Sequence, residues 1–238
     1  MSQITVIVIL LLVTFGHELA HALVASALGY KVKKIYFGIP LEVKIFGKIR
    51  SPILYKTYIR GVEVGISWLI LGGMVDFDDS GRVPFWKMSL IAVAGPLSNF
   101  LFALIPMILI LGISSGWSVT IFLVNTFLES IGLLITGAVP FTALSGVVSM
   151  VSSFSIMATT YSHGWLLVWL MINIGLAVTN ILPVPALDGG HIMMAGFTSV
   201  LGSLFGEKYV KAGDNITRMS LNVLMVLMIF VMAKGILF

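Results

Sequence analysis

Four stretches of the chain are long enough and apolar enough to cross a membrane as helices. They cover residues 4–28, 88–111, 165–182 and 221–238, and a helical span needs roughly 20 apolar residues. The whole chain is 58% hydrophobic and 10% charged, whereas an ordinary soluble domain is about 45–50% apolar and about 25% charged. These values exclude a soluble enzyme, a disordered chain and a coiled coil. We expect an all-α polytopic membrane protein with about four core transmembrane helices, forming one domain over residues 1–238.

The basic residues predict how this domain is oriented. Of the 14 Lys and Arg residues, ten lie in residues 30–87 and three lie in residues 184–218. Cytoplasmic loops of membrane proteins carry an excess of Lys and Arg. The loops 30–87 and 184–218 are therefore predicted to be cytoplasmic, with both termini outside. A net charge of +4 then concerns topology and lipid headgroups, and no nucleic-acid partner is expected.

The first cytoplasmic loop has the pattern of short strands. Apolar and polar residues alternate over residues 41–45 and 62–68, and a period of two is typical of half-buried strands. We expect a small membrane-associated β-sheet over about 34–76, with Gly61 at a turn; an amphiphilic loop without a fixed sheet is the alternative. Residues 132–158 are apolar but rich in Gly, Ser and Thr. They are predicted to form a re-entrant or interfacial segment before the third span.

The first span contains His17-Glu18-Leu19-Ala20-His21. Residues i and i+4 share one face of a helix, so His17 and His21 can bind one metal ion with Glu18 beside it as a general base. A charged residue inside a span costs at least about 2.5–3.5 kcal/mol on insertion scales. A bound cation would compensate for this cost, whereas a polar cluster that only joins helices is the alternative interpretation.

A hydrolytic zinc site uses three protein ligands and leaves the fourth position to water. The chain has no Cys, so the third ligand must be His, Asp or Glu. Asp188 is the best candidate, because it follows the third span in the segment 180–191, where two prolines interrupt the helix and two glycines follow the carboxylate. A plain turn at residues 188–190 is the alternative. His191 could stabilise an oxyanion or orient a ligand, or could be a polar residue of the cavity wall.

These motifs resemble the site-2 protease family of intramembrane zinc metalloproteases. The resemblance rests on His17 to His21 in the first span and on Asn180 with Leu187-Asp188-Gly189 after the third. Residues 72–75, 94–100 and 144–149 resemble further segments of its bacterial, RseP-like branch, although Val147 replaces the usual Pro. The family's PDZ domain has no counterpart in residues 112–164.

The resemblance implies one Zn²⁺ per chain, bound by His17, His21 and Asp188, with Glu18 as the catalytic acid/base. It also implies that Asn180 helps to hold substrate. The expected partners are the lipid bilayer and transmembrane protein substrates, such as anti-sigma factors or signal-peptide remnants, in a prokaryotic cytoplasmic membrane.

The predicted function is therefore an intramembrane zinc endopeptidase that acts in regulated intramembrane proteolysis. An extended substrate could pair with the strands predicted in loop 30–87 by β-addition. One alternative is a metal or ion transporter that uses buried His and carboxylates, although the inverted repeat frequent in transporters is absent from the sequence. A catalytically silent homologue is a further alternative, but all four key residues are present.

Overall fold

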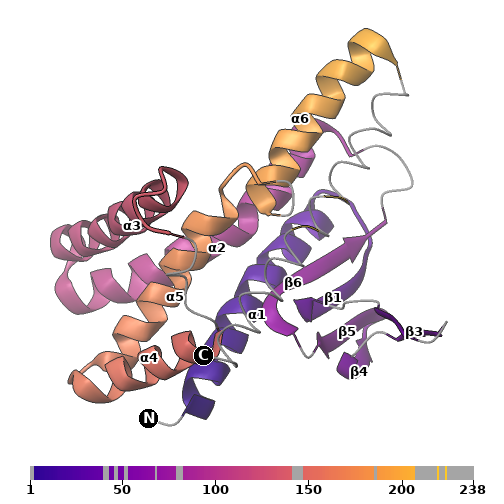
Figure 1. Ribbon diagram of the computed structural model, residues 1–238. Helices are drawn as coiled ribbons and strands as arrows, with labels where there is room; N and C mark the ends of the chain where they lie inside the picture. Colours follow the sequence, from indigo (N-terminus) through magenta and orange to yellow (C-terminus); the bar gives the residue numbers. More distant parts are fainter. Residues whose placement is uncertain are drawn as a thin grey trace.

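A computed structural model describes residues 3–39, 43–45, 48–50, 53–67, 69–78, 83–140, 147–184 and 187–206, together with Met219 and Val223 (Figure 1). The helices are α1 (Gln3–Ala27), α2 (Phe85–Leu111), α3 (Ile113–Ile135), α4 (Val147–Thr160), α5 (Gly164–Asn180) and α6 (Asp188–Phe205). The strands are β1 (Val32–Ile39), β2 (Val43–Ile45), β3 (Lys48–Arg50), β4 (Ile53–Ile59), β5 (Val62–Ser67) and β6 (Leu69–Phe77). The prediction of a helical membrane protein with a small sheet is confirmed.

Three of the described helices are long and apolar enough to cross a membrane, namely α1, α2 and α3. The first two agree closely with the spans predicted at 4–28 and 88–111. The predicted third span, 165–182, corresponds to α5, which is apolar but only 17 residues long. The predicted fourth span, 221–238, lies outside the described residues apart from Val223.

Helix α3 lies between α2 and α5, in a region where the sequence predicted no span. Residues 113–131 form most of this 23-residue helix, which is long and apolar enough to cross a membrane. Its hydroxyl side chains donate hydrogen bonds to backbone carbonyls one turn earlier, as in the pairs Ser118–Ser114, Thr120–Gly116 and Ser130–Thr126. Such internal bonds satisfy the polar groups and make Ser and Thr compatible with an apolar helix. The segment 132–158, predicted to be re-entrant or interfacial, contains the end of α3 and most of α4. Residues 141–146 lie outside the described part, and the position of the segment relative to the membrane stays a prediction.

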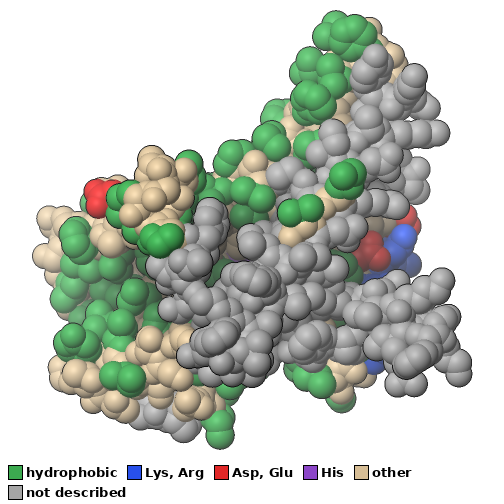
Figure 2. All heavy atoms as spheres, viewed as in Figure 1, with side chains coloured by type: hydrophobic (Ala, Val, Ile, Leu, Met, Phe, Trp, Pro, Cys, Tyr) green, Lys and Arg blue, Asp and Glu red, His purple; other side chains and the backbone are tan. Residues whose placement is uncertain are grey.

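Helix α5 packs between the other helices. One buried cluster joins Val6 and Val13 of α1 to Val151 of α4 and Val168 of α5. A second cluster joins α2 to α5 and is covered by side chains of α3. Inside a membrane such contacts stabilise the helices mainly through van der Waals packing. Figure 2 shows hydrophobic side chains spread over the helices on this face, while most of the visible charged side chains gather beside the sheet.

The four-stranded sheet has the order β4-β5-β1-β6, and β2 and β3 form a separate antiparallel pair. Strand β1 runs parallel to β5 and antiparallel to β6. The β4–β5 hairpin turns at Arg60 and Gly61, whose φ angles of 51° and 82° match a two-residue turn that needs two left-handed residues. The prediction of a turn at Gly61 is thus confirmed.

The strand order narrows which strands of loop 30–87 could pair with a substrate. Strand β5 occupies 62–67 and is hydrogen-bonded on one side to β4 and on the other to β1. Both of its backbone edges are therefore used. Among the described strands of this sheet, the outer positions belong to β4 and β6.

The sheet lies against the end of α1 that follows the two histidines. Ala22 and Ala25 of α1 form a buried cluster with Val32 of β1 and Ile91 of α2, and Val75 of β6 packs against this cluster. Helix α6 begins at Asp188 and packs along α2 (Figure 1). The elements that carry the predicted ligands therefore meet where α1, α2, α6 and β6 come together.

Candidate metal centre

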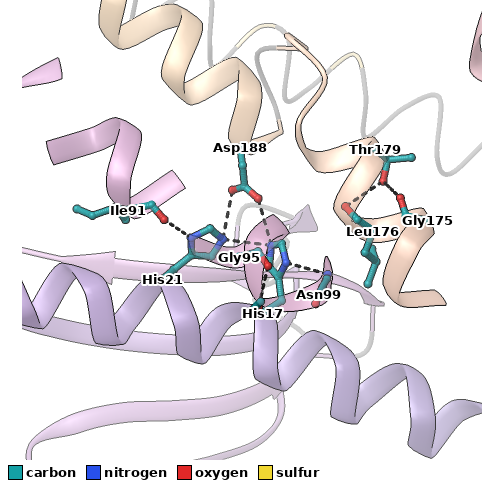
Figure 3. Close-up of polar contacts among 10 residues, drawn as sticks. His17, His21, Ile91, Gly95, Asn99, Gly175, Leu176, Thr179 and Asp188 are labelled. Atoms are coloured by element: carbon teal, nitrogen blue, oxygen red, sulfur yellow. Dashed lines mark hydrogen bonds and ion pairs between the residues drawn. The ribbon is translucent and has the colours of Figure 1, made fainter. Parts of the chain in front are cut away.

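His17, Glu18 and His21 lie on α1, and all three side chains are buried. The two histidines are one helical turn apart, so that their rings stand on the same face of the helix. Their Nε2 atoms are 3.1 Å apart. This face of α1 is turned toward α2 and the beginning of α6 (Figure 3).

Asp188 completes this group from the first residue of α6. Its Oδ2 atom is 3.1 Å from His17 Nε2, and its Oδ1 atom is 3.3 Å from His21 Nε2. The carboxylate reaches this position because the chain turns tightly after α5. A Cβ atom at Gly189 would collide with the backbone of Ile181 and Leu182, so the close approach of these segments requires glycine.

The nitrogen and oxygen atoms fit a zinc ion. In a tetrahedral site with metal–ligand bonds of about 2.0–2.2 Å, neighbouring ligand atoms lie about 3.3–3.6 Å apart. The two Nε2 atoms are 3.1 Å apart, and each contacts a different oxygen of Asp188, over 3.1 Å from His17 and 3.3 Å from His21, so these atoms lie at or slightly inside that spacing. Two imidazole nitrogens and one carboxylate oxygen are also a donor set that zinc accepts. The three residues could therefore hold a metal ion.

Helix α2 forms the wall behind the two histidines. His21 Nδ1 lies 2.6 Å from the backbone carbonyl oxygen of Ile91, and His17 Nδ1 lies 3.1 Å from Asn99 Nδ2. Between them, Gly95 faces both rings, because a Cβ atom there would come within 2.6 Å of His17 Nε2. Residues 91, 95 and 99 are spaced by four and thus follow one face of α2 (Figure 3).

Glu18 lies beside the three candidate ligands, but its side chain contacts the sheet. Its carboxyl group packs against Gly73 of β6, where a Cβ atom would approach Glu18 Cδ to 2.5 Å. The side chain is 5% exposed. The sheet therefore positions Glu18, whereas α2 and α6 surround the histidines.

Two other predicted site residues are less closely associated with this group. Asn180 is the last residue of α5 and is partly buried, and His191 lies one turn after Asp188 with an exposed side chain. Within the described residues, the cluster that could hold a metal contains neither of them.

The sequence predictions did not include the roles of Asn99, Gly95 and Gly73. The sequence signal that could have indicated a role for Asn99 is a polar side chain in an otherwise apolar span. Nothing in a single sequence indicates that it faces His17, since that contact depends on how α1 and α2 are aligned.

The chain is similar to a known protein family and to a curated protein. The model of peptidase family M50 matches residues 5–227. A protein of Vibrio cholerae serotype O1 named "Putative zinc metalloprotease" is 37% identical over 103 residues. That alignment covers 37% of this chain and 20% of the Vibrio protein. Because the family match extends over nearly the whole chain and includes the His17, His21 and Asp188 cluster, the chain belongs to peptidase family M50, the site-2 proteases.

Proposed function

We propose that this protein is an intramembrane zinc endopeptidase that hydrolyses peptide bonds in or near transmembrane segments. The observation that carries the proposal is the convergence of His17, His21 and Asp188, with Glu18 beside them, on apolar helices. Zinc bound there would act as a Lewis acid for hydrolysis of an amide bond. Membership of peptidase family M50 supports the same reaction.

The protein's own residues divide the remaining work. His17, His21 and Asp188 would hold the ion and fix its position. Glu18 packs against Gly73 and is not one of the three candidate ligands. Its carboxylate would therefore be available to accept a proton from the attacking water and deliver it to the leaving nitrogen. The buried surroundings of Glu18 keep bulk water away and strengthen these electrostatic interactions.

The substrate would reach this site as an extended strand. A peptide bond within a helix is shielded by its own hydrogen bonds, so a substrate span must unwind locally before hydrolysis. Strand β6 is an outer strand of the described sheet and carries Gly73 beside Glu18. A segment that adds to β6 by β-augmentation would therefore lie close to the Glu18 carboxylate. A segment that adds to β4 would be separated from β6 by β4, β5 and β1.

The preferred substrates are single-span membrane proteins, such as anti-sigma factors or the signal-peptide remnants left after secretion. The distribution of Lys and Arg favours a cytoplasmic position for loops 30–87 and 184–218 and an outer position for both termini. A metal transporter built on the same cluster would explain the buried His and carboxylate groups, but it would not require Glu18 between them.

The test is cleavage of a tagged single-span substrate by the purified protein in detergent. We expect wild type to cleave it and Glu18→Gln to lose at least about a hundredfold in rate, which is the lower end of the contribution of general acid–base catalysis. Glu129→Gln makes the same chemical change at an exposed position on α3 and should cleave like wild type. Equal rates for wild type and Glu18→Gln would overturn the proposal.

A further inference from the structure

Among the described residues, Asn99 is the one side chain that is hydrogen-bonded to the outer nitrogen of a candidate metal ligand. It is fully buried on α2, and its Nδ2 atom lies 3.1 Å from His17 Nδ1. Its Oδ1 atom is also buried and has no hydrogen-bond partner among the described residues. A buried carboxamide with an unused oxygen is costly, commonly by about 1–3 kcal/mol. This cost suggests that the group is retained for a purpose other than packing.

The second histidine shows which ring form a metal ligand needs at this site. His21 Nδ1 lies 2.6 Å from the Ile91 carbonyl oxygen, which can only accept a hydrogen bond. His21 Nδ1 must therefore carry the hydrogen and donate it. In the neutral ring, Nε2 then keeps its lone pair and points toward Asp188, as a metal ligand must.

His17 needs the same ring form, and it faces the carboxamide of Asn99 as well as the backbone of Gly95. To offer the Nε2 lone pair beside Asp188, its Nδ1 must carry the hydrogen and find an acceptor. The carboxamide of Asn99 has an acceptor end and a donor end of nearly the same shape. Rotation of this group by half a turn places Oδ1, the atom without a partner, against His17 Nδ1.

We propose that Asn99 is a positioning residue that accepts a hydrogen bond from His17 Nδ1 and thereby directs His17 Nε2 to the metal ion. This inference rests on the proposed metal site and adds a residue outside its ligand set. It gives the two histidines equivalent supports on one face of α2, a backbone carbonyl for His21 and a side-chain carbonyl for His17. These supports lie eight residues apart, at positions 91 and 99, while the two histidines lie four apart on α1.

The proposal predicts different effects for two substitutions of similar size. In Asn99→Leu the acceptor is lost, and the affinity for zinc should fall by about 10–100-fold, as is typical when the outer partner of a metal-binding His is removed. In Asn99→Asp both oxygens accept, so that the support of His17 is kept and zinc should bind at least as tightly as in wild type. A purely structural role would not produce this order, because Asn99 is fully buried and desolvation of a carboxylate there, without a hydrogen-bond donor to pair with it, would destabilise the fold at least as much as Leu.

The experiment is a zinc titration of the purified full chain in detergent, in competition with a chelator of known affinity. Asn173→Leu is the matched control, because Asn173 is also fully buried, has an unpartnered Oδ1 and donates instead to the Trp169 carbonyl. Its zinc affinity should remain within tenfold of wild type, below the range expected for loss of a supporting group.

Two results would overturn the role of Asn99 while leaving the metal site intact. One is wild-type zinc affinity in Asn99→Leu, and the other is an affinity in Asn99→Asp that falls by tenfold or more. Asn99→Asp decides the question even if Asn99→Leu fails to fold. Absence of zinc binding in wild type would instead contradict the proposed function itself, and the role of Asn99 with it.

Discussion

The missing side chain at Gly95 leaves room for both histidine rings to approach Asp188. A Cβ atom there would overlap His21 Nε2 and come within 2.6 Å of His17 Nε2. These are the atoms proposed to bind the ion. Gly73 of β6 likewise leaves room for the side chain of Glu18, because a Cβ atom there would overlap its carboxyl group. Gly95 of α2 and Gly73 of β6 thus leave room for the candidate metal ligands and for the proposed general base.

Gly95→Ala should abolish zinc binding, since the added methyl group must displace the Nε2 atoms of the ligands. Zinc content per purified chain measures the effect. Gly132→Ala on α3 is the control, because a Cβ atom at Gly132 meets nothing within 4 Å. That control should bind zinc normally and be more stable by about 0.5–1 kcal/mol, the usual advantage of Ala over Gly within a helix. Normal zinc content in Gly95→Ala would contradict this account of the α2 wall.

At the scale of secondary-structure elements, one polar cluster links three strands of the sheet. Tyr36 of β1 and Tyr58 of β4 both donate hydrogen bonds to Glu63 of β5, the latter over 2.7 Å. These hydrogen bonds from Tyr36 and Tyr58 lower the pKa of the Glu63 carboxyl. Burial, together with the bond to Glu63, raises the pKa of Tyr36 to about 12. The cluster therefore stabilises the sheet while Glu63 is ionised.

This arrangement predicts a stability that depends on acid. Because the pKa of Glu63 is lowered on folding, its contribution is fully present above the unfolded value of 4.5 and is lost as the pH falls through the lower folded value. Thermal unfolding in detergent, measured between about pH 3 and pH 6, should show this loss. In Glu63→Gln that part of the pH dependence should vanish. An unchanged profile in the variant would show that the cluster does not stabilise the fold.

Cross-linking can distinguish substrate binding at β6 from substrate binding at β4, the two outer strands of the sheet. The chain contains no Cys, so that a single introduced thiol reports one position. Met74 on β6 and Tyr55 on β4 are both exposed. With a single Cys near the cleavage site of a substrate, Met74→Cys in the Glu18→Gln background should form a disulfide, and Tyr55→Cys should not. The opposite pattern would place the substrate on β4.

At the scale of the whole molecule, the charges predict which side of the membrane each loop faces. Single thiols again provide the test, using a maleimide that cannot cross membranes. Leu54→Cys lies on exposed β4 in the basic loop, and Ser115→Cys lies near the start of α3. In intact cells Ser115→Cys should react, and Leu54→Cys should react only after permeabilisation. Labelling of Leu54→Cys in intact cells would reverse the predicted orientation.

The grouping of His17, His21 and Asp188 was predictable from sequence because it depends on local patterns. His17 and His21 share a helical face through their spacing alone, and Asp188 stands out as a carboxylate between an apolar span and two glycines. The strands at 43–45 and 62–67 followed from alternation. Helix α3 was missed because its Ser and Thr residues read as polar although their hydroxyl groups are satisfied within the helix. The interior place of β5 and the contact of Asn99 with His17 depend on pairing between distant segments, which periodicity does not encode.

The most direct test of the metal centre is the zinc stoichiometry of the purified chain, measured by elemental analysis in wild type and in Asp188→Ala. Asp188 contacts both histidines, so that its loss removes the third ligand of the proposed site. We expect one zinc ion per wild-type chain and a substoichiometric amount in Asp188→Ala. A wild-type protein without zinc, or a variant that retains a full equivalent, would contradict it.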